Sequence, residues 1–176
     1  QLGSAAGLVE IKNLAFVDAQ VSAQVGTLAK TVPVNGNLTI NVDNVFISHS
    51  TVPSYGGGGI LGRSPRLGSG GTTMNITNTV IYINGTDGGS YGAVAHTLND
   101  AYGLTFSNCY FAGANGTVVS SANLAIPTTG YAVYKDFSSL TADFIAGQVT
   151  GLSDFVFGIL ADVAGVKLIN SQNVAD

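Results

Sequence analysis

Six polar residues, five of them asparagine, each follow an apolar strand-like segment and recur along the chain at similar intervals. They are Asn13, Asn44, Asn78, Asn108, Asp143 and Asn170, and neighbouring members lie 27 to 35 residues apart. Asparagine and aspartate adopt the left-handed backbone region at lower cost than other non-glycine residues, so they suit a sharp corner between strands. A repeat of roughly 20–50 residues is typical of stacked supersecondary units. The pattern predicts stacked coils whose corner side chains form a hydrogen-bonded ladder.

A glycine-led segment recurs before each later corner and supports the same repeat. Its copies begin at Val25, Gly58, Tyr91, Gly130 and Phe157. In the first three copies we align Gly26, Gly59 and Gly92, which are 33 residues apart. The copy at Gly130 departs from the pattern, with Tyr131 where the glycine belongs.

Together the two landmarks predict an all-β fold, a single-domain parallel β-helix (β-solenoid) of about six coils with an Asn corner ladder. The coils are expected at residues 1–24, 25–57, 58–90, 91–129, 130–154 and 155–176. The longest insertion, residues 118–129, is expected to be a surface loop. Residues 153–169 crowd apolar side chains without alternation, which leaves a helix as the alternative there, but the repeat alignment favours strands.

Alternation around each corner predicts which side chains face the interior. The residues two before the corner should form an interior stack: Ile11, Val42, Ile76, Phe106 and Leu168. The residues directly before it should face water: Lys12, Asp43, Thr77 and Ser107. Two after the corner, an apolar stripe should face outward: Ala15, Phe46, Val80 and Tyr110. Two interpretations of the stripe stay open, a lateral contact surface or a surface covered by a loop such as residues 114–129.

Composition narrows the function classes. Charged residues make up 9% of the chain, against roughly 25% in typical soluble domains. The net charge is −4 and the six Lys and Arg are scattered, so no nucleic-acid partner is expected. The most apolar stretch, residues 155–169, is interrupted by Asp162 and Lys167 and is too short to cross a bilayer, so no membrane insertion is expected. The single cysteine, Cys109, excludes an intrachain disulfide and fits a small buried hydrophobe.

No convergent set of acid, base or metal ligands is apparent, so we expect no enzyme, no cofactor and no metal site. The repeat equivalents of Asp43 are Thr77 and Ser107, so stacking creates no acidic cluster. His49 and His96 occupy different repeat positions.

Four N-glycosylation sequons point to an extracellular or cell-surface glycoprotein, on condition that the source glycosylates secreted proteins. They begin at Asn37, Asn75, Asn84 and Asn115. No sequon falls on a position expected to face the interior.

The motif Gly58-Gly-Ile-Leu-Gly62, with an alternating strand after it and Phe106-Ser-Asn-Cys-Tyr-Phe in the next unit, resembles GLUG-type repeats. Such short repeats occur in large bacterial and protist surface proteins and adhesins, so the resemblance implies a parallel β-helix with an adhesive role. The corners are more distantly similar to those of pectate-lyase-like right-handed β-helices. Neither resemblance brings catalytic residues onto this sequence.

The leading hypothesis is therefore an extracellular structural or adhesive β-solenoid. No capping helix is expected at either end, and uncapped ends of a repeat stack expose unpaired backbone. We accordingly expect self-association end to end into a filament, or inclusion in a longer surface protein. The alternative is a carbohydrate-binding or carbohydrate-cleaving β-helix with surface glycans as partners. Its sugar-stacking residues would be Tyr55, Tyr82, Tyr102 and Tyr134.

Overall fold

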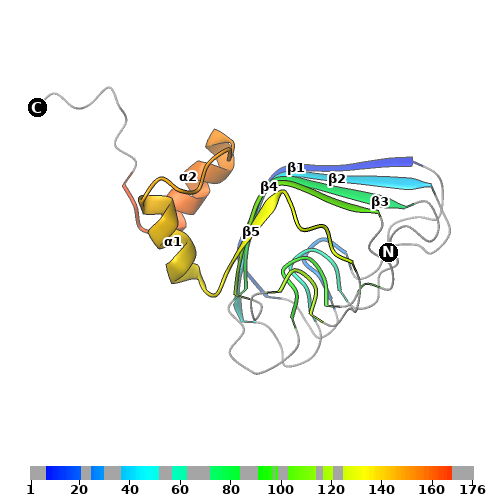
Figure 1. The fold of residues 1–176 in the computed structure, drawn as a ribbon, viewed down its shortest axis with the longest axis horizontal. Coiled ribbons are helices and arrows are strands. Elements are labelled where there is room, and N and C mark those ends of the chain that lie inside the picture. Colours follow the sequence, from blue (N-terminus) through cyan, green and yellow to red (C-terminus); the bar gives the residue numbers. More distant parts are fainter. Residues whose placement is uncertain are drawn as a thin grey trace, which may run out of the picture.

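The computed structural model describes residues 7–20, 25–29, 37–51, 57–62, 72–83, 91–96, 98, 103–113, 117–120 and 125–167. Its elements are β1 (Gly7–Gln20), β2 (Leu38–Thr51), β3 (Thr73–Ile83), β4 (Leu104–Gly113), β5 (Tyr131–Tyr134), α1 (Phe137–Ile145) and α2 (Asp154–Val163). The strands form one parallel sheet in the order β1-β2-β3-β4-β5 (Figure 1). The fold is mostly β, as the repeat predicts, but it also contains two helices.

The four long strands pair in the register that the corner residues predict. Ile11 pairs with Val42, Val42 with Ile76, and Ile76 with Phe106. The sheet bends at the corners, so β1–β4 each have two arms (Figure 1). The first arm comprises residues 7–12, 38–43, 73–77 and 104–107, and the second arm comprises residues 14–20, 45–51, 79–83 and 109–113.

A second row of parallel bridges runs through the glycine-led segments. Gly26 pairs with Gly58 and Gly58 with Gly92, so the predicted alignment through Gly59 was wrong by one residue. Four successive glycines have no side chains with which to mark the register, and the apolar residues that follow them decide it. The rows pack closely, since a Cβ on Gly26 would lie 2.3 Å from the carbonyl oxygen of Ile60.

The same row continues into a segment that was expected to be a surface loop. Val119 pairs with Ala95, and the neighbouring Val118 is buried in the main core. This part of residues 118–129 therefore belongs to the repeat. The copy expected at Gly130 instead leads into β5, where Tyr131 pairs with Cys109 of the second arm.

In the described part of the chain, each of the last two predicted coils contains a helix, although the first of them also contains β5. Asp143 lies inside α1 and is not a corner, and the glycine-led copy at Phe157 lies inside α2. The strand prediction for residues 153–169 was therefore wrong over α2. Asp136 caps α1 by accepting a hydrogen bond from the Ser139 amide at 2.8 Å. Asn170 and Leu168 lie outside the described residues.

Helical spacing of apolar residues explains why these segments leave the repeat. Leu140 and Phe144 on α1, and Val156 and Leu160 on α2, are four residues apart and buried. Both pairs pack in a cluster with Phe46 of the second arm. In the described ranges, neither helix has the length and apolar character needed to cross a membrane.

Two apolar cores result, one on each side of the second arm. The main core contains the inward residues of both arms and the bridge row, among them Ile40, Ile76, Ile81 and Phe111. The smaller core lies between the outer face of the second arm and the two helices, which flank that arm in Figure 1. The first arm has no such cover among the described elements.

Candidate functional site

The corner asparagines combine an unusual backbone with a side-chain ladder. Asn13, Asn44, Asn78 and Asn108 all have positive φ, between 47° and 55°. Asn44 donates its amide to Asn13 Oδ1 at 3.1 Å, and Asn108 donates to Asn78 Oδ1 at 3.2 Å. The middle rung differs, because Asn78 donates to Asp43 Oδ1 at 3.1 Å. Asn44 Oδ1 is consequently buried without a hydrogen-bond partner among the described atoms.

A second polar ladder lies on the outer face of the first arm, three residues before the corners. Asn75 donates its amide to Asn41 Oδ1 at 3.0 Å, and Thr105 donates its hydroxyl to Asn75 Oδ1 at 2.6 Å. Closer to the corner, Thr77 donates to Asp43 Oδ1 at 2.6 Å. Stacking in register places equivalent amides and hydroxyls one strand apart, about 4.8 Å.

This outer face contains a shallow hollow of about 160 Å³. It is lined by Lys12, Asn41, Asp43, Asn75 and Thr77. The lining side chains carry amide, hydroxyl, carboxylate and ammonium groups, which can form hydrogen bonds with a neutral polyhydroxylated ligand. Asn41 and Thr105 were not predicted for this role from the sequence, although the corner alignment already places them on one row.

The predicted apolar stripe is mostly covered by the chain itself. Phe46 and Val80 are fully buried against α1 and α2, Tyr110 is half-buried, and Ala15 is exposed. The lateral contact surface is therefore wrong for the two central residues. The covering elements are the C-terminal helices, whose apolar faces need the same burial.

The two described tyrosines proposed for sugar stacking, Tyr82 and Tyr134, do not form an open aromatic platform. Tyr82 already stacks on Phe137 of α1, with ring centroids 4.5 Å apart. Tyr134 is half-buried and packs against the smaller core. Tyr55 and Tyr102 lie outside the described residues.

The sequons differ in their surroundings. Asn37 is exposed directly before β2, which leaves room for a glycan. The Asn75 side chain is half-buried and bonded on both sides in the polar ladder, so it is a poorer acceptor. Asn84 and Asn115 lie outside the described residues.

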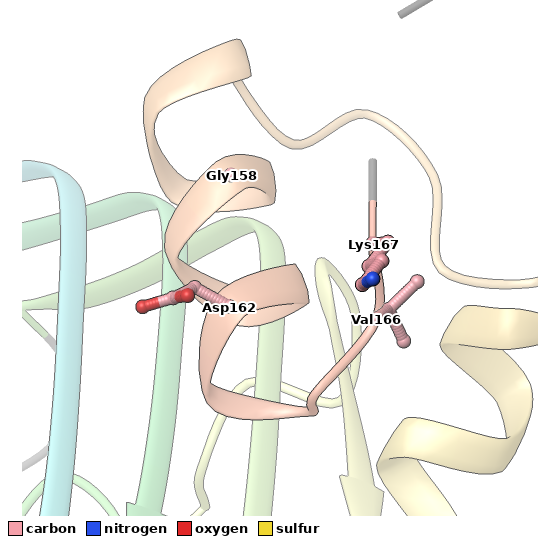
Figure 2. Close-up of a pocket in the computed structure, with 4 residues that line it drawn as sticks. All are labelled: Gly158, Asp162, Val166 and Lys167. Atoms are coloured by element: carbon pink, nitrogen blue, oxygen red, sulfur yellow. The ribbon is translucent and has the colours of Figure 1, made fainter. Parts of the chain in front are cut away.

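A larger open hollow of about 430 Å³ lies beside α2. It is lined by Gly158, Asp162, Val166 and Lys167 (Figure 2). The Asp162 carboxylate points away from Lys167 in this view, so the two charges do not converge on one point (Figure 2). We find no chemical function in this arrangement.

Two buried titratable groups are held in their neutral forms. His49 is 1% exposed, and burial lowers its pKa from 6.5 to about 4. Its Nε2 lies 2.6 Å from the Thr27 hydroxyl, while Nδ1 has no partner among the described atoms. Burial raises the pKa of the Cys109 thiol to about 11, and the thiol donates to the Ile76 carbonyl. Cys109 is therefore a weak nucleophile.

Within the described ranges, no group of three or more His, Cys, Asp or Glu side chains could hold a metal ion. In comparisons with known proteins, no family, no curated protein and no solved structure matches this sequence.

Proposed function

We propose that this chain is a parallel β-helix that serves as an extracellular structural or adhesive module. The proposal is supported by two parallel ladders in register, the sheet β1–β5 and the glycine-led bridges, with one apolar core between them. The β-helix proposed is shorter than six coils, because residues 137–163 are largely helical.

The observation that carries the structural role is the edge of β1, which no other strand of the described sheet covers. Leu8 and Val17 are 61% and 50% exposed on a strand of 14 residues. Long apolar edge strands are normally covered, because unpaired backbone groups invite pairing with another chain. The function proposed is accordingly end-to-end association, either into filaments or with further coils of a longer surface protein.

Electron microscopy of native material, together with light scattering across a wide concentration range, tests this function. We expect assemblies of more than one copy, or a longer polypeptide in which this segment is one part. A native protein that is a 17.8 kDa monomer at every concentration would contradict the self-association.

A second candidate function, glycan binding, is favoured by the polar hollow on the first arm. Its side chains form hydrogen bonds between strands at a regular spacing, and their remaining donors and acceptors face water. Binding of the wild type to a neutral polysaccharide on a glycan panel, with loss of binding in Asn41→Ala and Thr77→Ala, would support it. Equal binding by these variants would remove the hollow as the site.

A further inference from the structure

The free edge of β1 is apolar, yet it carries one oppositely charged pair. On the described part of the chain, β1 pairs only with β2, so its other side is an open edge. Leu8, Leu14 and Val17 are all more than 40% exposed there. Glu10 and Lys12 face outward and form an ion pair at 2.6 Å, with each side chain nearly half exposed.

The backbone at this edge alternates in a defined way. The Gly7 amide donates to the Asn37 carbonyl, so the N–H and C=O groups of Gly7 point toward β2. Successive residues of a strand point their backbone groups to opposite sides. The N–H and C=O groups of Leu8, Glu10 and Lys12 therefore point to the open edge and are ready to pair with another strand.

The opposite end of the stack offers a much poorer partner. β5 has only four residues and, among the described strands, pairs only with the second arm of β4. The rings of Phe106, Phe111 and Tyr131 cluster at that end with centroids 4.9 to 5.7 Å apart. A head-to-tail joint would therefore place the continuous 14-residue strand β1 against an edge that is divided between β5 and the first arm of β4.

From this geometry we infer that the β1 edge binds the β1 edge of a second copy, antiparallel and centred on Ile11. This inference rests on the proposed self-association and names its partner and register. Antiparallel pairing about Ile11 places Glu10 of each copy opposite Lys12 of the other. Centring on Glu10 would place two carboxylates opposite each other, and centring on Val9 would place Leu8 opposite Glu10. Opposite charges across strands stabilise a pair and like charges destabilise it, so charge selects the first register.

Hydrogen bonding agrees with the same register. Glu10 and Lys12 both point their backbone groups outward, so each Glu10–Lys12 pair exchanges two backbone hydrogen bonds. The two Ile11 residues form a non-hydrogen-bonded pair on the twofold axis, where side chains approach closely. Such an interface is isologous, so it closes at two copies and does not by itself propagate a filament.

Charge reversal tests the register in the full-length chain. Wild type should be a dimer by analytical ultracentrifugation, and Glu10→Lys and Lys12→Glu should each weaken the homodimer by roughly tenfold or more. Mixing these two variants should form a heterodimer, and the double variant Glu10→Lys/Lys12→Glu should again form a homodimer. The matched control Lys135→Glu reverses an exposed charge outside β1 and should leave the dimer unchanged. Far-UV circular dichroism checks that every variant is folded.

The outcomes separate this inference from the proposed function. If Glu10→Lys and Lys12→Glu assemble as tightly as wild type, the β1 register is wrong, but self-association is still supported. Open-ended assemblies built from wild type that persist in both single variants would overturn the closed dimer in favour of head-to-tail stacking. A wild-type monomer at all concentrations would overturn the inference and the self-association together.

Discussion

The two arms of the sheet share one interior but differ on their outer faces. Outside the first arm lie Asn41, Asn75 and Thr105, which bond to one another across strands and face water. Outside the second arm lie Phe46 and Val80, which are fully buried beneath α1 and α2. A strand that is apolar on both faces needs a second layer, whereas one with a polar outer face does not. At the corner residue, the outer face of the same strand changes from polar and open to water to apolar and covered by helices.

Alanine substitution on the outer face of each arm should show most clearly how much each face contributes to the free energy of unfolding. We expect Phe46→Ala to lower the free energy of unfolding by about 3–5 kcal/mol, because it leaves a cavity between sheet and helices. Asn41→Ala, on the open outer face of the first arm, should cost about 1 kcal/mol or less, because water replaces its hydrogen bond. Urea unfolding measures both, and equal costs would contradict the difference between the arms.

The shared interior can be tested through its buried histidine. The pKa of His49 is about 4 in the fold and near 6.5 when unfolded, so the unfolded chain binds a proton more readily. The His49 contribution is fully present above pH 6.5 and is lost as the pH falls toward 4, by about 3 kcal/mol.

The control for this pH dependence is His49→Gln, which retains a polar partner for Thr27 and does not titrate. Comparing the two proteins by urea unfolding at pH 7, 5.5 and 4 isolates the histidine from the carboxylates. If the two proteins lose stability in parallel over this range, His49 is not held neutral by burial.

The corner between the arms should show a smaller effect than Phe46→Ala. Asn78 has φ 47°, so Asn78→Ala should cost about 1–2 kcal/mol through left-handed strain, in addition to its two lost side-chain hydrogen bonds, with Asp43 and Asn108. Asn78→Gly loses the same two hydrogen bonds without the strain and should be the more stable variant. Thermal unfolding compares them, and equal stability would mean that backbone strain does not explain asparagine at the corner.

The main sheet could be predicted from local pattern because its information is repeated. The rung Ile11–Val42–Ile76–Phe106 follows from alternation around corners, and every strand supplies an independent copy of the same signal. The register of the glycine-led row could not be predicted in the same way, because consecutive glycines show no alternation. Gly58, and not Gly59, aligns with Gly26. Val118 was missed because Gly116, which begins its Gly-Thr-Val-Val segment, follows Gly92 by 24 residues and not by the 33 residues expected from the earlier copies.

Some features of the candidate sites could likewise be predicted from local sequence pattern, and others could not. The outward position of Asp43 and Thr77 was predictable. The polar ladder beside them could have been predicted by applying the same alignment to the positions three residues before each corner. The covering of Phe46 was not predictable, because the helices could be read as two more repeats. Asp143 resembles a corner by spacing alone, and it lies in α1 because Leu140 and Phe144 bury together on a helical face.

By itself the sequence determined the corners, the strand register and the inward stack, since these depend on residues close in the chain and on a repeated alternation. Only the tertiary structure decided which outer face is covered and which edge remains open. Those outcomes depend on where α1, α2 and β5 pack, and packing joins residues as far apart as Phe46 and Leu160. Local patterns cannot distinguish an apolar stripe that meets a helix of its own chain from one that meets a partner, because both require the same side chains.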